Sequence, residues 1–219
     1  MKLAIFNGSP RGNNSNTKIL LSHFQKGLER AGGSVTSIDY LIQEKHLEEQ
    51  VKHFKEAETI FLAFPLYVDS MPGMVKQFIE TIGNFDGSGK KILFLVQSGF
   101  PEAVHSMEVK NYLLLLSKRW KMECLCVIVK PGVEGIKIMP EMMTRKLFKK
   151  MEFMGNEFGM KRKLDEKDLA KLSGPYKFSK FRLGVFGLMQ KTGISNFYWD
   201  KNLKKNNAFE KRFDAPYAN

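Results

Sequence analysis

The sequence of 219 residues predicts an α/β fold in which helices cover both faces of a parallel sheet. Three observations lead to this class. Short apolar segments alternate, through the first half of the chain, with segments whose apolar residues recur at helical spacing. The apolar segments, such as 60–64, do not alternate with polar residues, which is typical of strands buried on both faces. Polar loops follow three of these strands, at the edge where such sheets bind ligands.

The first strand is expected at Leu3–Phe6, and the first helix begins near Ile19 and carries Phe24 and Leu28 on one face. Two glycines at 32–33 end that helix. The other strands are expected at Ser34–Asp39, Thr59–Phe64, Lys91–Val96 and around Cys124–Val129. The other helices are expected at His46–Lys55, Gly73–Ile82 (after Pro72) and Glu102–Lys118. Right-handed crossovers between parallel strands give a doubly wound, three-layer sandwich.

The loop Asn7–Thr17 joins the first strand to the first helix and suits an anion. The start of a helix offers free backbone N–H groups and the positive end of the helix dipole. The loop adds serine and threonine hydroxyls, asparagine amides and the guanidinium of Arg11. An ordinary polar loop, with Ser15 or Asn16 as the N-cap, is the alternative interpretation. Capping and phosphate binding use the same geometry.

Two common phosphate-binding patterns are absent from this loop. Lys18 follows Thr17 rather than a glycine, so the G-x-x-x-x-G-K-[ST] motif for nucleoside triphosphates is missing. The G-x-G-x-x-G motif for dinucleotides is missing as well. The loop therefore predicts a monophosphate site.

The two cysteines, Cys124 and Cys126, are expected on the same face of one strand as free, core-facing thiols, which indicates a reducing compartment. The amino terminus lacks the apolar core of a signal peptide, and no apolar run approaches the roughly 18 residues that a membrane span needs. We therefore expect a cytoplasmic location. No His, Cys, Asp and Glu spacing indicates a metal site.

Three motifs occur in order at the ends of the first, third and fourth strands. They are Gly8-Ser9-Pro10-Arg11 with Ser15-Asn16-Thr17, then Pro65-Leu66-Tyr67 with Ser70-Met71-Pro72-Gly73, then Ser98-Gly99-Phe100-Pro101-Glu102. Together they resemble the flavodoxin-like NAD(P)H-dependent FMN reductases over about residues 1–130. The resemblance implies a five-stranded parallel sheet of order 2-1-3-4-5. The cysteine cluster of one iron–sulfur subgroup is missing, so no such centre is expected.

The resemblance also implies a cofactor and its contacts. FMN is the expected cofactor, with NADH or NADPH as the reductant, and the flavin sites of this family lie at a homodimer interface. Because the flavin carries the hydride, no catalytic side chain is required. His105 follows the third loop and is a weaker candidate for a substrate contact. The expected phosphate-binding residues are Ser9, Arg11, Ser15, Asn16 and Thr17; the expected ring-binding residues are Pro65, Leu66, Tyr67, Met71, Ser98, Gly99, Phe100 and Glu102.

Residues 159–219 form a basic, aromatic-rich extension after an expected flavin-binding domain at 1–158. Residues 140–219 hold +9 of the formal net charge of +12, from 18 Lys and Arg against 9 Asp and Glu. A basic amphipathic helix is expected at Phe178–Met189, and Tyr198, Trp199, Phe209, Phe213 and Tyr217 follow it. We expect the extension to pack on its own domain or on a dimer mate. Nucleic acid or an anionic membrane surface is the less favoured partner.

The sequence thus favours an FMN-dependent oxidoreductase that passes hydride from NAD(P)H to a small-molecule acceptor such as a quinone, a nitro or azo compound, or a flavin. Two alternatives stay open at this point. One is a flavodoxin-like electron carrier with little reductase activity, although the basic charge disfavours it. The other is a protein that binds anionic surfaces through its basic extension.

Overall fold

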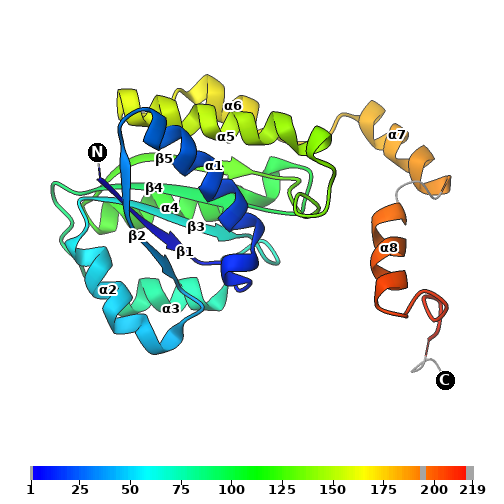
Figure 1. Cartoon of the computed structure of the whole chain (residues 1–219), viewed down its shortest axis with the longest axis horizontal. Coiled ribbons are helices and arrows are strands. Elements are labelled where there is room, and N and C mark those ends of the chain that lie inside the picture. Colours follow the sequence, from blue (N-terminus) through cyan, green and yellow to red (C-terminus); the bar gives the residue numbers. More distant parts are fainter. Residues whose placement is uncertain (1, 193–195, 216–219) are drawn as a thin grey trace. The chain divides into compact units, whose positions relative to one another are not determined.

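A parallel sheet of five strands, in the order β2-β1-β3-β4-β5, organises the computed structural model (Figure 1). The structure describes residues 2–192 and 196–215, without the side chains of 189–190 and 197–198. The strands are β1 Lys2–Asn7, β2 Ser34–Tyr40, β3 Thr59–Pro65, β4 Lys91–Gln97 and β5 Glu123–Lys130. The helices are α1 Asn16–Arg30, α2 Leu47–Glu56, α3 Gly73–Ile82, α4 Met107–Arg119, α5 Glu141–Lys161, α6 Glu166–Ser173, α7 Lys180–Lys191 and α8 Phe197–Lys205. The doubly wound class and the strand order are confirmed.

Helix α4 begins later than the sequence predicts. A 3₁₀ turn, Ala103–Ser106, occupies the start of the expected helix, and α4 follows it from Met107. Backbone hydrogen bonds from Ala103 N to Pro175 O and from Val104 N to Tyr176 O hold this turn. Tertiary contacts therefore decide where α4 starts.

Two apolar layers flank the sheet. Helices α2, α3 and α4 cover one face, where the rings of Phe54 and Phe78 both contact Phe6 of the inner strand β1. Helices α1, α5 and α6 cover the other face, where Phe24 of α1 packs edge-on against Phe61 of β3. Every residue of β3 is buried, as expected for a strand covered on both faces.

Helices α1 and α5 lie side by side, close enough for their backbones to touch (Figure 1). A Cβ atom on Gly27 of α1 would lie 1.8 Å from Glu152 O of α5. A Cβ atom on Gly155 of α5 would lie 1.9 Å from Phe24 O of α1. Only glycine permits this approach, which fixes the position of α1 above the sheet.

The prediction that both cysteine thiols share one face is wrong. Cys124 pairs with Ile92 and Cys126 pairs with Leu93, so the β5 strand has an extra residue, Leu125, at this point. This bulge turns the two thiols to opposite faces: Cys124 packs against the layer of α4, and Cys126 lies in the layer of α5. Both thiols are free, as predicted.

We expect the two thiols to differ in reactivity. Burial raises the pKa of Cys126 to about 12, and it also raises the pKa of the half-buried Cys124 thiol. Iodoacetamide should therefore label Cys124 slowly in the native protein and Cys126 only after unfolding. Mass spectrometry of the single variants Cys124→Ser and Cys126→Ser, in native buffer and in urea, measures each thiol alone. Equal labelling of both in native buffer would contradict the deeper burial of Cys126.

The chain divides into two units, Met1–Tyr176 and Lys177–Asn219. The extension predicted from residue 159 begins inside α5, and Leu164 and Leu172 beyond this point are buried in the core of the first unit. In the second unit, the guanidinium of Arg212 lies over the rings of Phe209 and Phe213. Tyr217 and the side chain of Tyr198, which the sequence also singled out, lie outside the described residues.

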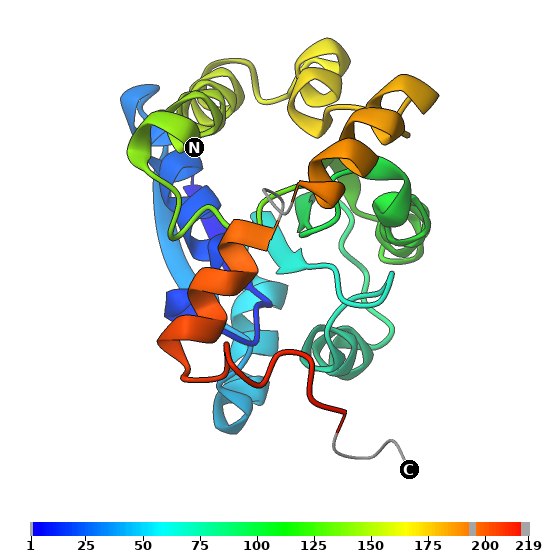
Figure 2. The ribbon, with the colours of Figure 1, turned by 90° about the vertical axis from the view of Figure 1, so that its right-hand side faces the viewer.

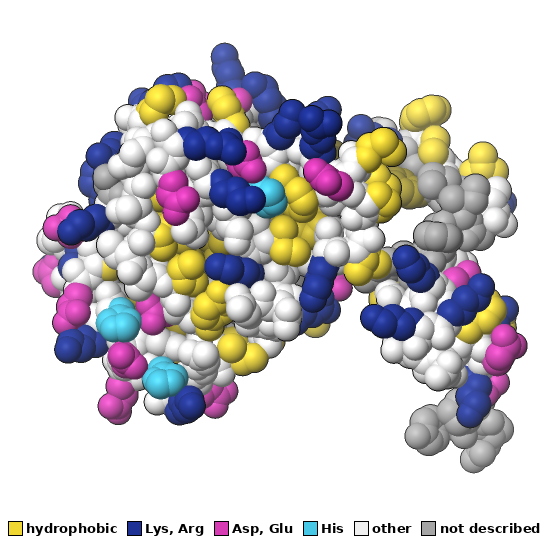
Figure 3. Space-filling view, in the orientation of Figure 1, with side chains coloured by type: hydrophobic (Ala, Val, Ile, Leu, Met, Phe, Trp, Pro, Cys, Tyr) yellow, Lys and Arg dark blue, Asp and Glu magenta, His cyan; other side chains and the backbone are white. Residues whose placement is uncertain are grey.

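Charges are distributed over the surface rather than gathered in one patch on the face that Figure 3 shows. There, Lys and Arg side chains are separated by acidic, apolar and uncharged ones. Among the described residues, no helix is long and apolar enough to cross a membrane.

Candidate functional site

The loops after β1, β3 and β4 meet at the carboxyl edge of the sheet, the edge that Figure 2 faces. Backbone hydrogen bonds join neighbouring strand ends here: Leu66 N, after β3, donates to Gln97 O of β4 at 2.7 Å, and Ser98 N, after β4, donates to Lys130 O of β5 at 3.1 Å. A narrow cleft lies between the loops, as expected at the switch point between β1 and β3. It is lined by Ser9, Arg11, Asn16, Pro65, Leu66, Tyr67, Gln97, Ser98, Gly99 and Glu134.

The first loop is held by its own side chains. Ser9 N donates to the buried Asn7 Oδ1 at 3.0 Å, and Arg11 N donates to Ser9 Oγ at 3.3 Å. Ser15 is the N-cap of α1: its Oγ accepts from Lys18 N at 3.0 Å and donates to Gly12 O at 2.6 Å. The capping prediction for Ser15 is confirmed. These hydrogen bonds fix the path of the first loop.

The start of α1 points toward the cleft and can receive an anion. Asn16 and Thr17 occupy the first helical turn, so their backbone N–H groups have no carbonyl one turn earlier to bind. The positive end of the helix dipole adds to their attraction for negative charge. Thr17 itself is fully buried, and its Oγ1 accepts a hydrogen bond from Gln97 Nε2 at 3.2 Å. This bond ties the first loop to the end of β4.

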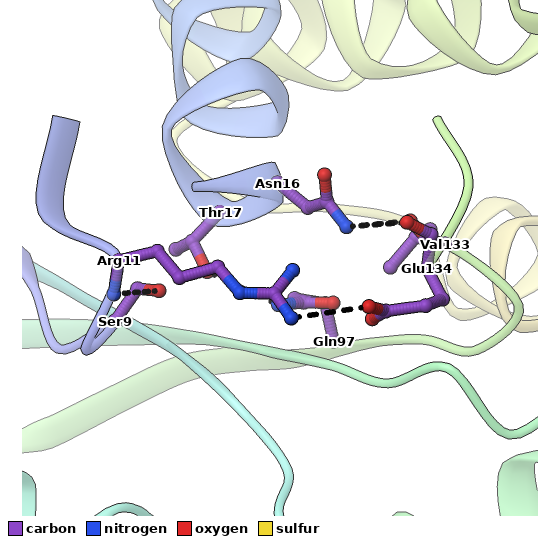
Figure 4. Close-up of polar contacts among 7 residues, drawn as sticks. All are labelled: Ser9, Arg11, Asn16, Thr17, Gln97, Val133 and Glu134. Atoms are coloured by element: carbon purple, nitrogen blue, oxygen red, sulfur yellow. Dashed lines mark hydrogen bonds and ion pairs between the residues drawn. The ribbon is translucent and has the colours of Figure 1, made fainter. Parts of the chain in front are cut away.

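A fourth loop, after β5, closes the cleft on the side facing Arg11 (Figure 4). Arg11 Nη2 donates to Glu134 Oε1 at 3.2 Å. Asn16 Nδ2 donates to Val133 O at 2.8 Å and to Glu134 O at 3.1 Å. The side chain of Asn16 thus holds this loop in place, while Arg11 forms an ion pair that is half exposed.

The second loop makes a tight turn with positive φ angles. Tyr67 and Ser70 exchange backbone hydrogen bonds of 2.8 and 3.0 Å across Val68 and Asp69. These two residues have φ of 48° and 59°. Positive φ is uncommon for a β-branched residue such as Val68, which is 92% exposed. Such strain concentrates at ligand-binding segments.

The third loop is linked to the second through His105. Its ring stacks on Phe100 with centroids 4.3 Å apart, and its Nδ1 lies 3.3 Å from Asp69 Oδ1. Gly99 leaves room for the fourth loop, since a Cβ atom there would lie 3.2 Å from Glu134 Cβ. His105 therefore connects the two loops at the rim of the cleft.

The predicted site residues fall into two groups. Those that line the cleft are Ser9, Arg11, Asn16, Pro65, Leu66, Tyr67, Ser98 and Gly99. The others lie around it: Ser15 and Thr17 are buried in the first loop, Met71 packs against the core, and Phe100 and Glu102 belong to the rim near His105.

Two lining residues, Gln97 and Glu134, were not among the predicted contacts. Gln97 ends β4 and begins the third loop. Glu134 follows β5 in the segment Pro131-Gly132-Val133-Glu134-Gly135. The rule that ligands bind beyond the carboxyl ends of the strands applies to this loop too, and its glycines are a turn signal that could have drawn attention to it.

Lys130, the last residue of β5, is a cation behind the third loop. Its Nζ donates to Pro131 O, and burial, aided by the charge of Lys150, lowers its pKa to about 8. It does not line the cleft among the described residues. Arg11 is therefore the cation that faces a ligand there.

Comparisons with known proteins agree with this geometry. A protein family described as having the flavodoxin-like fold matches residues 1–138. No curated protein has a significantly similar sequence.

The solved structures that are similar to this chain include the following three. An FMN-dependent NADH-azoreductase from Bacillus anthracis has a TM-score of 0.56 and 14% identity, over 73% of this chain and 100% of its own. An NADPH-quinone reductase from P. pentosaceus has a TM-score of 0.55 and 19% identity, over 74% and 99%. An NAD(P)H:quinone oxidoreductase from Methanothermobacter marburgensis has a TM-score of 0.56 and 16% identity, over 72% and 96%. At these identities the likeness establishes the fold.

Proposed function

Because the chain belongs to the family with the flavodoxin-like fold, we propose that it is an FMN-dependent oxidoreductase. It takes hydride from NADH or NADPH and passes it to a small-molecule acceptor such as a quinone, a nitro or azo compound, or a flavin. The observation that carries this proposal is the anion cradle at the start of α1, which opens into a cleft between three loops at the switch point of the sheet.

The residues present fit a flavin phosphate. Arg11 supplies a guanidinium, Ser9 a hydroxyl, and the first turn of α1 supplies the N–H groups of Asn16 and Thr17. The ordered first loop holds these donors in place through Asn7 and Ser15, so little conformational entropy is lost when a phosphate binds. One carboxylate, that of Glu134, pairs with the positive charge of Arg11.

The other two loops fit the flat ring. Leu66 and Tyr67 offer apolar contact on one side of the cleft, and Gly99 lets the backbone of the third loop come close on the other. When bound, FMN supplies the hydride acceptor and donor. The chain's own task is to orient the ring, exclude water through Tyr67 and Phe100, and offer backbone N–H groups where negative charge builds up.

The similar structures described above are those of an FMN-dependent NADH-azoreductase and of two NAD(P)H-dependent quinone reductases, which supports the same class of reaction here. The cytoplasmic location, the homodimer and the packing of the basic extension stay predictions.

The visible spectrum of the protein, purified or reconstituted with FMN, tests the proposal. Flavin absorbance near 450 nm in roughly one equivalent, together with a higher melting temperature, is the expected result because a ligand that binds only the folded state stabilises it. Rapid bleaching by NADH or NADPH in a stopped-flow mixer would identify a reductase, whereas sluggish bleaching would indicate the electron carrier. No flavin binding at all would overturn the proposal.

A further inference from the structure

The carboxylate of Glu134 occupies the place where a ligand phosphate would meet Arg11. Its Oε1 lies 3.2 Å from Arg11 Nη2 (Figure 4). Its Cβ lies close to Gly99 of the third loop. We infer that Glu134 is an internal anion that competes with the phosphate of FMN for Arg11, and so limits how strongly the site prefers FMN over riboflavin. This inference rests on the proposed function.

The backbone keeps Glu134 beside the cleft whether or not the ion pair forms. Asn16 Nδ2 donates to the carbonyls of Val133 and Glu134, and Val133 N donates to Ser98 O at 2.9 Å. Val133 is fully buried. Only the side chain of Glu134, which is 45% exposed, is free to turn away from Arg11. The negative charge therefore stays close to the site after a phosphate has displaced it.

The charges of the cleft explain why Glu134 would affect FMN more than riboflavin. Among the described lining residues, Arg11 is the only cation and Glu134 the only carboxylate, so their formal charges cancel. A phosphate dianion can bind the guanidinium of Arg11 only if the ion pair with Glu134 breaks. The phosphate then lies near the displaced carboxylate, which repels it. Riboflavin carries a hydroxyl instead of the phosphate and meets neither cost. The partial exposure of both side chains screens the effect and keeps it moderate.

The test measures the dissociation constants of FMN and riboflavin, by quenching of flavin fluorescence, for the full chain and for Glu134→Gln. The variant keeps the shape of the side chain and removes its charge. We expect FMN to bind about three- to tenfold more tightly to the variant, with riboflavin unchanged. The gain should shrink in 1 M salt, because exposed charges are screened there.

Glu123→Gln is the matched control. Glu123 Oε2 lies 3.3 Å from Lys91 Nζ, in a similarly exposed ion pair at the opposite edge of the sheet, where β4 and β5 begin. It should leave both dissociation constants unchanged. Unchanged or weaker FMN binding by Glu134→Gln would overturn the inference, and so would equal tightening of FMN and riboflavin, which would indicate a steric effect. Failure of the unmodified chain and the variant to bind either flavin would instead overturn the proposed function, and with it this role of Glu134.

Discussion

Arg11→Gln is expected to raise the dissociation constant for FMN by about 30- to 150-fold. A hydrogen bond between a charged donor and a charged acceptor contributes roughly 2 to 3 kcal/mol, and about 1.4 kcal/mol corresponds to a factor of ten. The substitution also leaves the carboxylate of Glu134 without its guanidinium partner beside the phosphate. The remaining donors, at the start of α1, then face the phosphate together with an unpaired negative charge.

Fluorescence titration with FMN and with riboflavin measures this effect. Riboflavin affinity should stay within about twofold, since the contact is to the phosphate. The dissociation constant of Arg11→Lys for FMN should lie between those of the unmodified chain and of Arg11→Gln. Lysine keeps the positive charge but lacks the planar, two-pronged guanidinium. Arg30→Gln is a suitable control, because Arg30 is the last residue of α1, at the end away from the cleft. Its guanidinium forms an ion pair with Glu152 of α5. Equal FMN affinity of Arg11→Gln and the unmodified chain would remove Arg11 from the phosphate site.

Gly155→Ala is expected to destabilise the first unit by about 3 kcal/mol or more. The added methyl would lie 1.9 Å from the carbonyl oxygen of Phe24, which belongs to the backbone of α1 and has no rotamer to escape into. Helices α1 and α5 must then separate, and the buried rings of Phe24 and Phe158 lose packing. The better helix propensity of alanine, about 1 kcal/mol, offsets only part of this cost.

Urea unfolding followed by circular dichroism measures this loss. Gly73→Ala is the control within the same unit: Gly73 begins α3, and a Cβ atom there meets nothing within 4 Å, so no loss is expected. Because α1 carries the anion cradle at its start, Gly155→Ala should also weaken FMN binding at temperatures where the variant is still folded. A stability equal to that of the unmodified chain would show that α1 and α5 do not touch at these glycines.

Local sequence pattern was sufficient for the order of elements. Unbroken apolar runs such as 60–64 and helical spacing such as that of Leu20, Phe24 and Leu28 depend on the side chains of one segment, and the structure has strands and a helix there. Ser15 could be recognised as a cap for the same reason. Polar loops at the ends of strands likewise predicted the edge of the sheet at which the cleft lies.

Predictions from local sequence pattern were wrong where contacts with other segments set the local structure. The spacing of Cys124 and Cys126 predicts that both thiols lie on the same face of the sheet. The bulge at Leu125, which arises from pairing with β4, places the Cys126 thiol on the opposite face. The start of α4 at Met107 depends on hydrogen bonds to Pro175 and Tyr176, which lie about seventy residues further along the chain.

The sequence by itself determined the doubly wound fold, its five strands and the anion-binding character of the first loop, because periodicity, turn residues and helix caps act within a few residues. Only the tertiary structure decided that Glu134 lies against Arg11, that Asn16 holds the loop after β5, and that Gly27 and Gly155 bring α1 onto α5. These contacts join residues more than a hundred positions apart. Their geometry follows from how the sheet and helices pack, which no local pattern of residues encodes.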